Sequence, residues 1–309
     1  MPDKRKIHAK GRAEAGLYSA KERIIPCALS PERKALITSY VADLKAHAHE
    51  IGDHGLSYEE FWKSGIFQSA IERIRGTQAA STKKKREFVE EILSFMKGRG
   101  DILSYTFTGS HDRHDYQVEL SDGTHSVFEM KGCLDGNNTT IYTRPANAEE
   151  FTMWSLCQNS SANPGHNAWS GIHTRLGGKI ISRREIMDGL IIWDMLCGTS
   201  SRPCPKIIEN PERATKLPGG RVVPPPCLYL LPKTVPDVRN NPAPKSWKLA
   251  EIGFLKALYD TFKGKPDDVT EVIIECRMNE VTVERMTKLV RNEKTVCQSR
   301  WTKLNQAKT

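Results

Sequence analysis

The apolar positions in the first part of the chain recur at helical spacing. Ser30-Pro31-Glu32-Arg33 offers an N-cap residue followed by proline at the first helical position, and apolar residues then lie three and four positions apart from Leu36 to Leu44. Ser57-Tyr58-Glu59-Glu60 has the form of a capping box ahead of further apolar residues. These patterns predict that residues 1–82 form a helical N-terminal region.

The stretch from Lys83 to Gly100 has the pattern of one amphipathic helix. Six apolar residues between Phe88 and Met96 fall within an arc of about 160° when successive residues are 100° apart. Glycines at positions 98 and 100 end the pattern, as glycine commonly does just past a helix C-terminus. We expect this helix to bury its apolar stripe.

After Gly100 the helical spacing gives way to alternation and to short apolar runs, which are typical of strands. Strands are predicted over residues 103–108, 116–120, 125–131, 189–197, 227–231 and 272–276. Helices are predicted from Asn147 to Leu156 and from Trp247 to Phe262. From Val281 to Leu304, two helix-like segments on either side of Asn292-Glu293 predict a basic helical C-terminal region.

The composition is that of an ordinary globular protein, with 38% hydrophobic and 27% charged residues among 309. At roughly 150 residues per domain, the chain is long enough for one large or two modest domains, each with a core of its own. Its apolar runs are far shorter than the ~20 residues that cross a bilayer, and no apolar run follows the charged N-terminus. We therefore expect no membrane segment and a cytoplasmic location.

The eight cysteines are scattered, and no two are spaced as a CxxC pair. A cytosolic chain of this size does not depend on disulfides, so we expect reduced thiols. Cys197, Cys204 and Cys227, taken together with His173, match no common zinc-binding spacing. No zinc site is therefore predicted.

The net charge of +9 is concentrated at the two ends of the chain. Residues 1–12 carry a net charge of +4 and residues 285–309 a net charge of +6, which leaves −1 for the 272 residues between them. Basic ends around a near-neutral body favour a polyanionic partner, of which nucleic acid is the commonest. A solvated basic surface is the alternative.

The candidate chemistry lies in a predicted hairpin, residues 114–131. Glu129 and Lys131 share one face of a strand because side chains alternate. A two-residue turn at Asp122-Gly123 would place Asp115 opposite Met130, on the other face. A three-residue turn with the glycine in the left-handed conformation would place Asp115 opposite Glu129. The second register also separates the charged face from one with aromatic packing.

Two carboxylates with a lysine beside them on a strand pair suit a Mg²⁺-dependent phosphodiesterase. Hard oxygen ligands hold Mg²⁺, which can lower the pKa of a bound water and neutralise charge on the phosphate. The Lys131 ammonium can orient that water or support its deprotonation. An ordinary exposed hairpin with a salt bridge is the alternative.

In these residues the chain resembles the PD-(D/E)XK nuclease superfamily, and especially its type II restriction endonucleases. The matching residues are Asp115, Glu129 and Lys131, between the predicted helix that ends at Met96 and the one that begins at Asn147. His114 stands where the family usually has proline. The motif is short, so its context carries most of the weight.

The resemblance implies a fold and a division of the chain. The fold would be of the α/β class, with a restriction-endonuclease-like mixed β-sheet flanked by helices. The nuclease core would span residues 83–232, preceded by the helical region 1–82 and followed by an α/β extension with a basic tail at 233–309.

The resemblance also implies a role for each site residue. Asp115 and Glu129 would ligate the metal, the backbone carbonyl of Met130 would add a ligand, and Lys131 would assist the nucleophilic water. An additional acid often comes from the preceding helix. Glu91 is the candidate here, because it flanks the apolar stripe of that helix.

We therefore expect a type II restriction endonuclease that hydrolyses phosphodiester bonds of duplex DNA at a specific short sequence with Mg²⁺. A homodimer is expected, because two sites related by a two-fold axis match the two strands of a palindrome. The candidate DNA-binding residues are Arg183, Arg184, Arg291, Lys294, Arg300 and Lys303. The rivals are a DNA repair or junction-resolving nuclease of the same fold and a non-catalytic DNA-binding protein.

Overall fold

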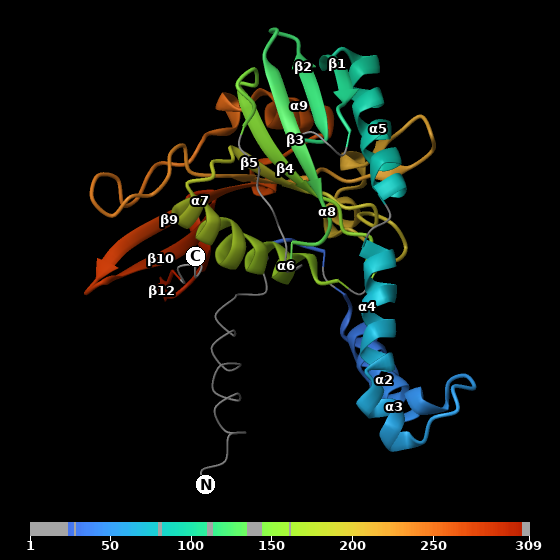
Figure 1. Cartoon of the computed structure of the whole chain (residues 1–309). Coiled ribbons are helices and arrows are strands. Elements are labelled where there is room, and N and C mark those ends of the chain that lie inside the picture. The colour runs from blue at the N-terminus through green and yellow to red at the C-terminus, as the bar shows by residue number, and fades with distance from the viewer. Residues whose placement is uncertain are drawn as a thin grey trace.

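One large β-sheet runs through the molecule, and helices lie against its two faces (Figure 1). The computed structural model describes residues 24–27, 29–79, 82–109, 114–134, 144–160 and 162–304. The α-helices are α2 Pro31–His47, α3 Tyr58–Ser64, α4 Ile66–Ala79, α5 Thr82–Arg99, α6 Pro164–Ser170, α7 Gly177–Arg183, α8 Pro205–Glu209 and α9 Gly253–Thr261. The strands are β1 Ile102–Phe107, β2 Tyr116–Leu120, β3 His125–Lys131, β4 Glu150–Ser155, β5 Gly189–Ile192, β6 Thr215–Lys216, β7 Val222–Val223, β8 Cys227–Leu230, β9 Val269–Asn279, β10 Thr282–Arg291, β11 Lys294–Gln298 and β12 Thr302–Lys303.

The pairing of the strands makes the sheet a mixed one. β1, β2 and β3 are antiparallel neighbours, β4 and β5 follow in parallel to β3, and β8 is antiparallel to β5. β9 lies parallel to β8, and β10 pairs in antiparallel fashion with β9, β11 and β12. The predicted α/β class, with a mixed sheet flanked by helices, is confirmed. Strands from the predicted C-terminal extension belong to the same sheet as those of the predicted core.

Each face of the sheet buries an apolar surface. α5 and α9 pack on the face that carries Tyr116 and Phe128. On the other face, which carries Val127, lies the helix of residues 164–183, formed by α6, a π-helical segment and α7. Because side chains alternate along β3, Glu129 and Lys131 lie on the face that the 164–183 helix covers.

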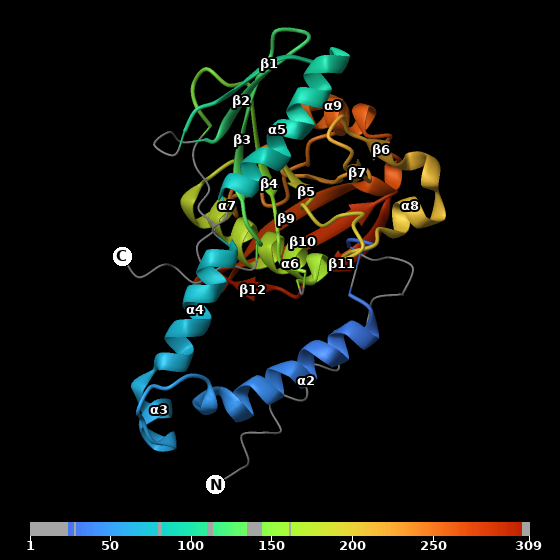
Figure 2. The same cartoon turned by 90° about the vertical axis from the view of Figure 1, so that its right-hand side faces the viewer.

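The N-terminal helices begin at the caps that the sequence predicts. The Ser30 side chain accepts a hydrogen bond from the Arg33 backbone N–H at 3.2 Å, and Ser57 with Glu60 forms a capping box. Figure 2 shows α2, α3 and α4 projecting away from the sheet. Within the described ranges, no helix combines the length and apolar character that a bilayer crossing requires.

The prediction of a helix from Asn147 to Leu156 is wrong, because these residues contain the strand β4. All six residues of β4 are buried, between the parallel neighbours β3 and β5. A strand covered on both faces shows no alternation, so its pattern does not distinguish it from a buried helix. Glu149 and Glu150, which resemble a helix start, accept hydrogen bonds from backbone N–H groups of other elements.

The predicted basic helical C-terminal region is also wrong, because this part of the chain forms β10, β11 and β12. Asn292 and Glu293 are the two-residue turn of a hairpin, with φ angles of 48° and 63°. Positive φ at both central residues gives the turn that matches the twist of paired strands. As strands, these residues bury Leu289 and Val296 in the core beneath the 164–183 helix.

Candidate active site

The β2–β3 hairpin has the turn that brings Asp115 beside Glu129. Residues 121–123 form the turn, and its glycine lies in the left-handed region with a φ of 84°. Tyr116 pairs with Phe128, as predicted for the three-residue turn. Asp115, one residue further out, therefore lies across from Glu129 on the opposite face from the aromatic pair. The predicted three-residue turn is confirmed.

Hydrogen bonds join the charged residues on this face. Asp115 Oδ2 accepts from the Met130 backbone N–H at 2.6 Å, and Lys131 Nζ donates to Glu129 Oε1 at 2.5 Å. The carboxyl groups of Asp115 and Glu129 also share a hydrogen bond. Since the side chains of Glu129 and Lys131 are only 10% and 19% exposed, these contacts lie largely out of water.

Burial makes it costly for the two carboxyl groups to be ionised together. It raises the pKa of Glu129 to about 7, with a further contribution from the charge of Asp115 and against the attraction of Lys131. Burial also raises the pKa of Asp115, while the Met130 N–H and Lys131 oppose that rise. The shared hydrogen bond lowers the pKa of Asp115 and raises that of Glu129, so it favours a proton on Glu129 over one on Asp115.

The oxygen atoms at the pair suit a hard divalent cation, which would take the place of the proton. Phe128 accepts a hydrogen bond at 3.1 Å from the Asp115 N–H, so its carbonyl points towards β2. Carbonyls two residues apart on a strand point to the same side, and the Met130 carbonyl therefore points towards the pair. In the part of the chain that the structure describes, no three His, Cys, Asp or Glu residues gather as a metal-binding group. A cation here would therefore rest on two carboxylates, the Met130 carbonyl and water.

Two lysines from neighbouring helices, Lys85 near Asp115 and Lys179 near Lys131, are site residues that the sequence analysis does not predict. Burial lowers the pKa of Lys85 in α5, while the charge of Asp115 raises it. Burial also lowers the pKa of Lys179 in α7, and Lys131 is among the nearby cations that lower it further. A visible signal for Lys85 is the run of four basic residues at the start of α5, where cations oppose the helix dipole.

The structure does not bring Glu91 to the carboxyl pair. Its carboxylate pairs with Arg221 at 3.0 Å. It also lies close against the backbone of Gly219, where a side chain would meet the Glu91 Oε1 atom. These partners belong to the segment of β6 and β7, on the side of the sheet that α5 covers. Among the described residues, the site therefore has the carboxyl groups of Asp115 and Glu129 without that of Glu91.

The candidate DNA-binding residues lie in three separate places. Arg183 and Arg184 end α7, where Arg184 pairs with Asp237 at 3.6 Å. Arg291 and Lys294 pair across the β10–β11 turn. Lys303 lies in β12 and pairs with Glu284 of β10, and Arg300 lies two residues before β12. That these six residues contact DNA stays a prediction.

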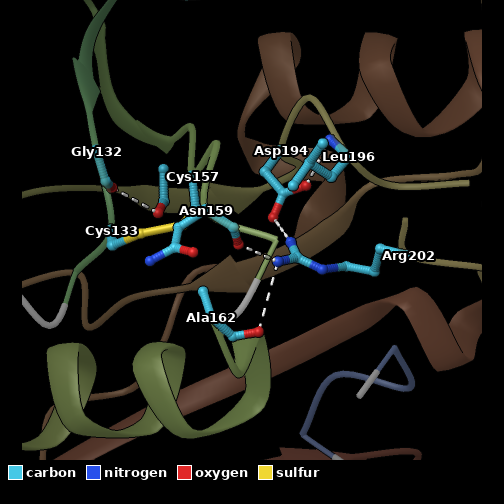
Figure 3. Close-up of a disulfide and its surroundings, with 9 residues drawn as sticks. Gly132, Cys133, Cys157, Asn159, Ala162, Asp194, Leu196 and Arg202 are labelled. Carbon is cyan, nitrogen blue, oxygen red and sulfur yellow. Dashed lines mark hydrogen bonds and ion pairs between the residues drawn. A yellow bond between two sulfur atoms is a disulfide. The ribbon is translucent and has the colours of Figure 1, made fainter. Parts of the chain in front are cut away.

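A disulfide joins Cys133 to Cys157 (Figure 3), and the strand pairing places it close to the site. Cys133 follows Lys131 by two residues, and Lys131 pairs with Ser155, which precedes Cys157 by two. The prediction of reduced cysteines is therefore wrong for this pair. The two residues are 24 positions apart, and only the parallel pairing of β3 with β4 brings them together.

No protein-family model, curated protein or solved structure matches the chain. The resemblance to the PD-(D/E)XK nucleases therefore rests on the hairpin residues and on their geometry.

Proposed function

We propose that this protein is an endonuclease of the restriction type, which uses Mg²⁺ to hydrolyse phosphodiester bonds of duplex DNA at a specific short sequence. The observation that carries this proposal is the buried Glu129 beside the half-buried Asp115, with Lys131 on the same strand face. A hairpin with a purely structural role has no use for such a pair, because carboxyl groups withdrawn from water cost the fold free energy.

The contacts of each residue support a distinct role. Asp115 and Glu129, with the Met130 carbonyl, would hold the metal, and the Met130 N–H fixes the Asp115 carboxyl beside Glu129. When bound, Mg²⁺ supplies charge stabilisation for the phosphate and an acidified water. Lys131 is held against Glu129, where its ammonium can orient the attacking water and take part in its deprotonation.

The surroundings of the pair favour a phosphodiester as the substrate. Lys85 and Lys179 approach it from α5 and α7, on different sides of β3. Lys131 adds a third cation close to the two carboxyl groups, and Glu185 lies near Lys179. Cations around a partly buried site attract a polyanion and stabilise the charge that develops on the phosphate.

The decisive experiment is a digest of phage DNA with the purified protein in Mg²⁺, in Ca²⁺ and in EDTA. Discrete fragments in Mg²⁺ alone support the proposal. A smear or branch-dependent cutting would indicate a repair or junction-resolving nuclease instead, and intact DNA with retained binding a non-catalytic DNA-binding protein. Lys131→Ala should abolish cutting. Lys45→Ala is the matched control, because Asp43-Leu44-Lys45 is an acid-x-Lys triplet on the helix α2.

The proposal includes a homodimer, because one active site cuts one strand. None of the 17 residues of α2 is buried, and Leu36 and Tyr40 are 71% and 69% exposed. This apolar surface on the projecting helices is one that a second copy would cover. Sedimentation velocity with duplex DNA tests this expectation. Complexes that contain one chain per duplex, with no complex of two chains, would refute the homodimer.

A further inference from the structure

A second polar hollow, of about 750 Å³, lies between α8, the start of β9 and the β10–β11 turn. Its lining contains five cationic and three acidic residues, none of which belongs to the candidate active site. We call it the α8 groove. On its floor, Asp268 pairs with Lys206 at 2.7 Å and with Arg213. At its rim, Lys265 and Lys294 are exposed.

The floor of the α8 groove carries an excess of positive charge. Lys206, Arg213 and Asp268 are 8%, 6% and 2% exposed, and one carboxylate serves two cations. The Arg213 Nε atom, moreover, has no hydrogen-bond partner in the described part of the chain. Buried charge that is incompletely compensated within the protein favours an anionic ligand.

The strand register places the α8 groove in line with the candidate active site. One row of paired residues crosses the sheet from Lys131 on β3, through β4, β5 and β8, to Asp268 just before β9. Strands lie about 4.8 Å apart, so four spacings separate the two residues by roughly 19 Å. Lys294 on β11 is two spacings further, at roughly 29 Å.

We propose that the α8 groove binds the sugar-phosphate backbone of the duplex DNA whose scissile phosphate lies at Asp115 and Glu129. The inference rests on the proposed function and adds a second contact with the same substrate. With a rise of 3.4 Å per base pair, the separation corresponds to roughly six to nine base pairs. Such a contact fixes the orientation of the duplex and carries no sequence information of its own.

The test replaces the two rim lysines, because they are exposed and the floor stays intact. Lys265→Gln combined with Lys294→Gln removes two cations, and Lys216→Gln combined with Lys245→Gln removes two exposed lysines outside the groove as the matched control. Binding of a 24-base-pair duplex is measured by fluorescence anisotropy in Ca²⁺ over a range of salt. Each lost phosphate contact flattens the slope of log affinity against log salt by about 0.9. Between 50 and 200 mM salt, the wild type should therefore lose about twelvefold more affinity than the groove variant.

The remaining outcomes overturn the inference. An unchanged slope would show that the groove does not contact phosphates, and an equal flattening in the control variant would show an effect of net charge alone. Saturable binding of deoxyadenosine monophosphate, with an unchanged duplex slope, would make the groove a small-molecule site. Because the assay does not involve cleavage, a flattened slope in a protein that never cuts DNA would refute the proposed activity and keep the groove contact.

Discussion

Glu129→Gln should stabilise the protein at alkaline pH while it abolishes activity. The pKa of this carboxyl is raised to about 7, from an ordinary value of 4.5. Between these values the folded protein holds a proton that the unfolded chain has lost, so the free energy of unfolding falls as the pH rises. One step in pKa corresponds to about 1.4 kcal/mol, so the ionised Glu129 costs the fold about 3 kcal/mol near pH 8.

The assay is urea denaturation of the wild type and of Glu129→Gln at several pH values without divalent metal. Most other groups titrate alike in the two proteins, so the difference between their free energies of unfolding isolates residue 129. From pH 4.5 to about pH 8 this difference should grow by about 3 kcal/mol in favour of the variant. A difference that does not change with pH would refute the raised pKa of the buried Glu129 carboxyl.

Magnesium provides the second half of the test. At about pH 8, Mg²⁺ at a hundred times its dissociation constant should raise the free energy of unfolding of the wild type by about 2.7 kcal/mol. Glu129→Gln keeps the shape of the side chain and loses one of the two carboxylates, so the same addition should leave it nearly unchanged. Equal stabilisation of both proteins would show that the cation binds elsewhere.

Three further substitutions test the metal-binding role of Asp115, the burial of Arg285 and the turn at Gly123. Asp115→Ala, like Lys131→Ala, should abolish cleavage in a gel assay while duplex affinity in Ca²⁺ stays near the wild-type value, because phosphate contacts elsewhere supply most of the affinity. Arg285→Met should raise the free energy of unfolding in urea by about 1 to 3 kcal/mol, because the buried Nε and Nη1 atoms have no partner among the described residues and burial lowers the pKa of the guanidinium; a loss of stability would contradict this. Gly123→Ala should lower the free energy of unfolding by about 1 kcal/mol in thermal denaturation, because its φ is 84° and the space around its Cβ position is open. A neutral result there would contradict the turn geometry.

The hairpin can be predicted from the sequence because its geometry is local. Two alternating strands joined by a turn have few possible registers, and Gly123 lies where the three-residue turn needs a left-handed residue. That register alone decides that Asp115 joins Glu129. The site's acidic pair is therefore predictable without any knowledge of the rest of the fold.

The elements around the hairpin are not local in this sense. β4 is a strand because β3 and β5 flank it and helices cover both faces, and none of this is visible in its six residues. β10 and β11 are strands because their apolar residues reach a core formed by distant segments. The basic residues of the C-terminal region fit a helix as well as a strand, so their spacing does not distinguish the two structures.

The same distinction separates the site residues that the sequence predicts from those that it misses. Lys85 lies near Asp115 because α5 packs beside the hairpin, and Lys179 lies near Lys131 because the 164–183 helix covers the other face. Glu91 looks suitable from its place beside the apolar stripe, yet that stripe faces the sheet on the side away from the carboxyl pair. Helix orientation, which depends on tertiary packing, decides all three.

The position of the carboxyl pair is itself evidence for a role outside folding. Glu129 pairs with Met153 in the middle of the sheet, on a face where Val127 and Phe151 are fully buried. An apolar residue at position 129 would bury its side chain without the cost of about 3 kcal/mol that the ionised carboxyl carries. That cost is a large part of the 5 to 15 kcal/mol by which a typical domain is stable. Because stability does not account for the pair, and a divalent cation would offset its charge, cation binding is the property that best explains why two carboxyl groups stand there.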